Sequence, residues 1–116
     1  MISGLVWGGT RTENFDATIS FFDDVMGLER DQQQPGFVSF KLPNGDKFEV
    51  FGPTDTDHSF FTTGPVIGFG VGDVDAARAR LESAGIEFVA PTQGEGGYRW
   101  AHFRGPDGNI YELTSS

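Results

Sequence analysis

Two glutamates stand at equivalent places in two similar stretches of this sequence. Glu49 lies in PNGDKFEVF (43–51) and Glu112 in PDGNIYELT (106–114), with His102 shortly before the second stretch. Carboxylates and imidazoles bind divalent metals, and they also move protons in general acid–base catalysis. We therefore take Glu112, His102 and Glu49 as candidate catalytic residues. A metal site and a metal-free acid–base site both stay open at this point.

Both stretches predict a β-hairpin with a three-residue loop, because Pro-Asn-Gly and Pro-Asp-Gly suit a type I turn followed by a left-handed Gly. This register pairs apolar with apolar residues: Phe40 with Phe48, Val38 with Val50, Phe103 with Tyr111 and Ala101 with Leu113. It places Ser39 opposite Glu49 and His102 opposite Glu112. Both glutamates should then lie on the sheet face that points away from the helices, together with Phe37, Phe51, Trp100 and Arg104.

The hairpins end two copies of a longer unit. In the first half, a strand near Leu5–Trp7 precedes a helix that Asn14 can cap, with an apolar face of Phe15, Ile19, Phe22 and Met26. In the second half, the strand PVIGFGV precedes a helix that Asp73 can cap, with an apolar face of Val74, Ala77, Leu81 and Ala84. An extended stretch and the hairpin follow each helix. Each half therefore reads strand, helix, strand, strand, strand.

The repeat divides residues 1–116, which we expect to form a single domain. Module one should cover about 1–52, an irregular linker about 53–64, and module two about 65–116. The Gly-rich stretch 90–98 is predicted to be a flexible loop.

Composition narrows the function classes. The chain has 116 residues, no cysteine and a net charge of -9 with only 8 Lys and Arg, which argues against nucleic acid and anionic membranes as partners. Without cysteine there can be no disulfide framework. No stretch predicts a signal peptide or a membrane span, so we expect a cytoplasmic protein.

Three stretches resemble the vicinal oxygen chelate (VOC) superfamily, the group of glyoxalases, bleomycin-resistance proteins and extradiol dioxygenases. They are FFDDVMGLE (21–29), GVGDVDAARARLESAG (70–85) and FRGPDGNIYEL (103–113). The resemblance implies an α+β fold of two tandem βαβββ modules, whose mixed sheet forms a cup with the helices outside. It also implies a small-molecule ligand and a homodimer.

Metal-using members of this superfamily draw ligands from the first strand of each module and from the glutamate after each hairpin. The glutamates are present here as Glu49 and Glu112, but Trp7 and Val66 occupy the strand positions and cannot bind a metal. The resemblance therefore implies an incomplete metal site, and no cofactor is expected. A divalent metal held by Glu49, Glu112 and His102 is the less favoured alternative.

These inferences predict a glyoxalase- and bleomycin-resistance-like protein that binds a small molecule in the cup, for sequestration, resistance or sensing. The acidic balance favours a cationic or amine-bearing aromatic ligand. The expected ligand contacts are Trp7, Phe37, Ser39, Glu49, Phe51, Trp100, His102 and Glu112. Three alternatives remain: a metal-dependent lyase, isomerase or dioxygenase with a divergent site, aromatic residues that pack a dimer, and a module filled by its own side chains.

Overall fold

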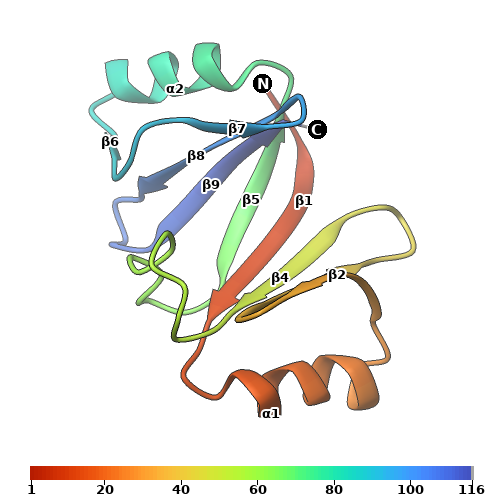
Figure 1. Ribbon diagram of the computed structural model, residues 1–116. Coiled ribbons are helices and arrows are strands. Elements are labelled where there is room, and N and C mark those ends of the chain that lie inside the picture. The colour runs from red at the N-terminus through yellow and green to blue at the C-terminus, as the bar shows by residue number, and fades with distance from the viewer. Residues whose placement is uncertain (116) are drawn as a thin grey trace. The chain divides into compact units, whose positions relative to one another are not determined.

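A computed structural model describes residues 1–115 and divides them into two compact units (Figure 1). Residues 8–65 form one unit, and residues 1–7 with 66–115 form the other. We call them the 8–65 unit and the 66–115 unit. Strand β1 (Ile2–Arg11) contributes residues to both.

The 8–65 unit is built on module one. After β1 come helix α1 (Phe15–Ser20), a π-helical turn η1 (Phe21–Val25), and the strands β2 (Glu29–Gln34), β3 (Phe37–Lys41) and β4 (Lys47–Phe51). The strand order is β2-β3-β4-β1, and β2, β3 and β4 pair antiparallel. Ile19 of α1 packs on Val38, Phe40 and Val50, so the helix covers one face of this sheet.

The 66–115 unit is built on module two. It contains β5 (Val66–Val71), α2 (Val74–Ser83), β6 (Glu87–Phe88), β7 (Gln93–Glu95), β8 (Tyr98–Arg104) and β9 (Ile110–Ser115). The strand order is β1-β5-β9-β8-β6, with β7 also paired to β8. Strands β5 and β9 run parallel, whereas β8 pairs antiparallel with β6, β7 and β9. Val74 and Ala77 of α2 pack on Ala101, Phe103 and Leu113, so this helix also covers one sheet face.

The two units confirm the predicted α+β fold of βαβββ-type modules with a mixed sheet. Both hairpins have the predicted three-residue loop. Leu42 and Gly105 each donate their N–H to the carbonyl four residues ahead, and Gly45 and Gly108 have φ values of 90° and 84°. Only glycine adopts this left-handed conformation without strain, which explains why both loops end in Gly.

Two local predictions were wrong. The predicted loop at 90–98 contains β7, which pairs Gln93 with Trp100 on β8. The helix of module one does not keep its phase to Met26, because η1 inserts a wider turn that rotates the residues after it. Phe15, Ile19 and Phe22 reach the core as predicted, while Met26 is 55% exposed.

The two helix starts also differ. Asp73 caps α2, since its carboxylate accepts a hydrogen bond from the N–H of Ala76 at 3.0 Å. Asn14 stands at the N-cap of α1, but its side chain makes no cap hydrogen bond. The Thr12 hydroxyl instead accepts from the N–H of Asn14 at 3.0 Å.

Within residues 1–115, no helix has the length and the apolar character needed to cross a membrane.

Candidate functional site

The register of the hairpins places both glutamates as the sequence predicts. Ser39 pairs with Glu49 between β3 and β4, and His102 pairs with Glu112 between β8 and β9. Their neighbours along the strands, Phe40 and Phe48 or Phe103 and Tyr111, pack on the helix side. Side chains alternate along a strand, so each glutamate lies on the face opposite its helix.

Glu112 and His102 form a buried pair in the 66–115 unit. Their exposed fractions are 4% and 3%, and His102 Nε2 lies 2.9 Å from Glu112 Oε1. Burial removes the water that would solvate a charged imidazole, and this lowers the pKa of His102 to about 4. The imidazole is therefore neutral at pH 7.

Gly68 allows the indole of Trp7 and the carboxylate of Glu112 to approach each other. It pairs with Glu112 between β5 and β9, and a Cβ at its position would lie 2.9 Å from Trp7 Cβ and 3.0 Å from Glu112 Oε2. Any larger residue would push them apart. Trp100 lies two residues before His102, opposite Thr114, so it is on the same face. Trp7, Trp100, His102 and Glu112 therefore share one face of this unit.

The other four predicted ligand contacts lie on the equivalent face of the 8–65 unit. Phe37 and Phe51 are paired and stacked, with ring centroids 5.3 Å apart. Ser39 is buried, and its hydroxyl accepts a hydrogen bond from the N–H of Gln32 at 3.1 Å. Glu49 is half-buried. The eight predicted residues thus fall into two sets of four, one in each unit.

The linker contributes a cluster that sequence reasoning missed. The His58 ring stacks on Phe51 with centroids 3.9 Å apart, and Phe61 meets both rings edge-on. Asp55 holds His58 through Oδ1, 3.0 Å from Nδ1, while Arg11 Nε donates to the backbone carbonyl of Asp55 at 3.1 Å. The linker therefore covers Phe51. The signal was present in the sequence, because DTDHSFF places an acid three residues before a histidine and aromatic residues just after it.

The sequence matches the profile of the Glyoxalase/Bleomycin resistance protein/Dioxygenase superfamily over residues 5–113. The chain belongs to this superfamily. The match confirms the resemblance that the three sequence stretches carry, and it spans both modules. A comparison with curated proteins finds no significant relative of this superfamily member.

Solved structures of low sequence identity share the fold of this superfamily member. One is a glyoxalase/bleomycin resistance protein/dioxygenase superfamily protein from Vibrio splendidus 12B01, 21% identical, covering 94% of this chain and 96% of that chain, with a TM-score of 0.70. Another is a variant of methylmalonyl-CoA epimerase from Streptomyces coelicolor in complex with 2-nitronate-propionyl-CoA. It is 22% identical, the match covers 100% of this chain and 99% of that chain, and the TM-score is 0.70. A third is described as an NAD-dependent benzaldehyde dehydrogenase from Legionella pneumophila. It is 13% identical, the match covers 94% of this chain and 96% of that chain, and the TM-score is 0.70.

The side chains of the 66–115 unit do not fit the metal of metal-using superfamily members. Glu112 and His102 supply two donors, but Trp7 and Val66 offer none. A catalytic metal needs about three protein ligands. Among residues 1–115 no three His, Asp or Glu side chains gather in a way that could hold a metal ion.

Proposed function

We propose that this superfamily member binds a small aromatic or cationic molecule, with Trp7, Trp100, His102 and Glu112 as contacts in the 66–115 unit. The observation that carries the proposal is the buried Glu112, held beside His102 and Trp7 over a glycine. A buried carboxylate costs stability unless it serves an interaction. An indole face and a carboxylate together are the groups that attract an organic cation.

Binding without a metal or other cofactor is part of this proposal. It is supported by the two-donor set around Glu112 and by the apolar residues Trp7 and Val66 at the strand positions. Phe37, Ser39, Glu49 and Phe51 stay predicted ligand contacts of the 8–65 unit. A cytoplasmic location and a homodimer likewise stay predictions of the sequence.

The test uses benzyltrimethylammonium as an aromatic cation and the tryptophan fluorescence as the signal. We expect saturable binding to the wild type and about 10-fold weaker binding to Glu112→Gln, because the cation loses its anionic partner. Glu87→Gln is the matched control, since it removes the same charge from an exposed strand residue. Equal losses in both variants would mean that only net charge attracts the cation, and the proposed site would be wrong.

An acid–base enzyme is the second candidate, and the 2.9 Å approach of His102 to Glu112 favours it. In this candidate the Glu112 carboxylate takes a proton from a carbon acid and returns it, while the neutral His102 beside it positions the carboxylate. Methylmalonyl-CoA is the first compound to test, because an epimerase acting on it shares the fold. Deuterium entering its α-position in D₂O, and lost in His102→Gln, would establish this enzyme in place of a binding protein.

A metal assay distinguishes the proposed metal-free binding from the alternative of an enzyme with a divergent metal site. Protein purified without chelator is expected to carry less than stoichiometric Zn, Ni, Mn or Fe. A stoichiometric metal that disappears in Glu112→Ala would contradict the proposal and support a metal-dependent lyase, isomerase or dioxygenase.

A further inference from the structure

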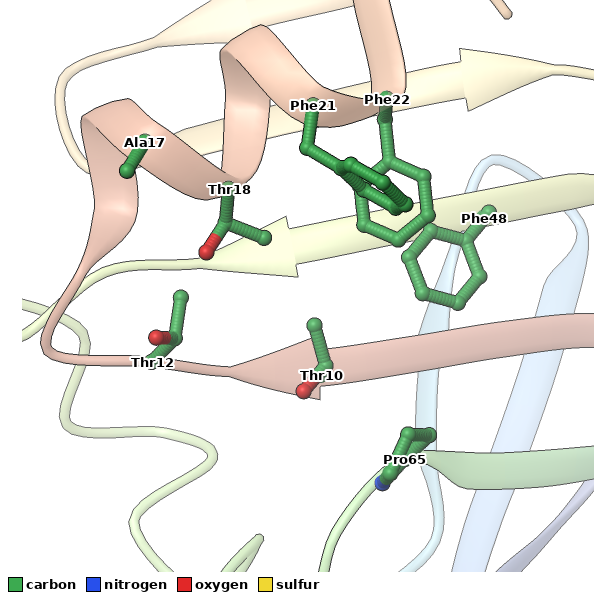
Figure 2. Close-up of a pocket in the computed structure, with 8 residues that line it drawn as sticks. All are labelled: Thr10, Thr12, Ala17, Thr18, Phe21, Phe22, Phe48 and Pro65. Atoms are coloured by element: carbon green, nitrogen blue, oxygen red, sulfur yellow. The ribbon is translucent and has the colours of Figure 1, made fainter. Parts of the chain in front are cut away.

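Each module holds a groove between the start of its helix and the end of its first strand. Groove one, in the 8–65 unit, has a volume of about 360 Å³ and includes Thr10, Thr12, Thr18, Phe21, Phe22 and Phe48 in its lining (Figure 2). Groove two, in the 66–115 unit, has a volume of about 260 Å³ and includes Val71, Asp73, Ala76, Ala77 and Arg80.

The two grooves are copies of one another. The repeat offset of 59 residues carries Thr12, Ala17, Thr18 and Phe21 onto Val71, Ala76, Ala77 and Arg80, and all eight residues line their grooves. The βαβββ module therefore creates a groove at this place by itself. What each groove can bind depends on the side chains that differ between the copies.

Groove one has an aromatic end formed by three phenylalanines. Figure 2 shows Phe21, Phe22 and Phe48 side by side at one end, with Thr12 and Thr18 toward the other. The Phe22 ring is 4.7 Å from that of Phe48 and meets Phe21 edge-on at 5.2 Å. Phe21, the first residue of the π-helical turn, is 46% exposed. This end offers ring edges and faces to a flat apolar molecule.

The opposite end of groove one offers two oriented hydroxyls. Thr12 Oγ1 accepts from the N–H of Asn14 at 3.0 Å, which leaves its own O–H to donate. Thr18 Oγ1 donates to the carbonyl of Asn14 at 2.8 Å, which leaves its lone pairs to accept. The backbone of Asn14 thus fixes one donor and one acceptor, the pair that a ligand hydroxyl requires.

We propose that groove one binds a neutral, planar aromatic molecule that carries a hydroxyl group. Its volume lies within the ~300–1,000 Å³ of ordinary ligand pockets. No charged side chain lines it, so an ionised ligand would gain no countercharge, whereas groove two places Asp73 and Arg80 at its lining. The site is distinct from the proposed cation site, because Phe48 lies on the helix side of the sheet and Glu112 belongs to the other unit.

The experiment titrates the full chain with 2-naphthol, which is uncharged at pH 7, and follows backbone amides by NMR. We expect saturable shifts at Thr12, Thr18 and Phe22. Phe21→Ala should weaken binding about 10-fold, because a large part of the ring contact is lost. Arg80→Ala is the matched control at the repeat-equivalent position and should leave the affinity unchanged.

A second arm tests the hydroxyls. Wild type should bind 2-naphthol about 10-fold more tightly than naphthalene, and Thr18→Val, which keeps the side-chain shape, should remove most of this preference. 2-Naphthoate, an anion of similar size, should bind more weakly than 2-naphthol. Thermal unfolding verifies that each variant folds. Shifts confined to the face of Trp7 and Trp100, unchanged affinity in Phe21→Ala, or no saturable shift in wild type would each overturn the proposal.

Discussion

Glu112 and His102 are polar residues buried on one face of the sheet, where two apolar residues would cost less free energy of folding. Burial of such groups is tolerated when polar partners lie close by, and His102 Nε2 lies 2.9 Å from Glu112 Oε1. The same burial prevents His102 from becoming charged near neutral pH, because the imidazolium would lose its hydration. One residue therefore couples the stability of the 66–115 unit to pH.

Acid should weaken the fold through His102. The unfolded imidazole takes up a proton near pH 6.5, but the folded one does so only near pH 4. The unfolded state therefore binds more protons in this interval, and the free energy of unfolding should fall by up to about 3 kcal/mol as the pH drops from 6.5 to 4. Urea unfolding at several pH values measures this loss.

His102→Gln isolates this contribution from that of the carboxylates. The variant should lose the part of the pH dependence that comes from the imidazole, while His58→Gln should keep it. A pH dependence that is the same in wild type and in His102→Gln would show that the folded imidazole titrates normally.

Gly68 lies where a larger side chain would meet both Trp7 and Glu112. Gly68→Ala should lower the free energy of unfolding by about 1–3 kcal/mol, because the new methyl group would lie too close to Trp7 Cβ and to the Glu112 carboxylate. Gly72→Ala is the matched control, since a Cβ there meets nothing within 4 Å. Chemical denaturation of both variants gives the difference, and equal stabilities would refute the close packing.

The two helices of the repeat start with different chemistry. Asp73→Ala should destabilise the protein by about 1 kcal/mol, because α2 loses the acceptor for the Ala76 N–H. Asn14→Ala, at the corresponding position of α1, should cost clearly less, since the Asn14 side chain caps nothing. Thermal unfolding of the pair measures the contrast. A larger loss in Asn14→Ala would mean that α1 is capped through its side chain after all.

At this scale the sequence predicts pairing better than it predicts helix phase. Phe40 with Phe48 and His102 with Glu112 could be foreseen because the Pro-Asn-Gly and Pro-Asp-Gly loops allow one register that buries apolar residues on one face. The π-helical turn at Phe21–Val25 has no comparable signature, so the predicted apolar face wrongly includes Met26. The role of His58 was missed because stacking on Phe51 joins residues of a strand and an irregular linker, which no periodicity connects.

The whole chain is predicted to form a homodimer. Large apolar side chains are exposed in both units, including Leu5 at 60% and Val25 at 73%, and such side chains are commonly covered by a partner. Light scattering after size exclusion should give twice the 12.6 kDa of one chain. A mass of one chain at high protein concentration would refute the dimer.

Strand β1 is divided between the two units, and this has a consequence for the order in which the protein folds. Residues 8–65 are continuous, so their unit has all its residues once Pro65 has been made. The other unit needs residues 1–7, yet their partners begin only at Val66, and Ser3 must reach across 67 residues to donate to the carbonyl of Gly70. The parallel pairing of β5 with β9 is also non-local, and such contacts form slowly. During synthesis residues 1–7 therefore cannot pair until β5 has been made, and the half that carries Glu112 is completed second.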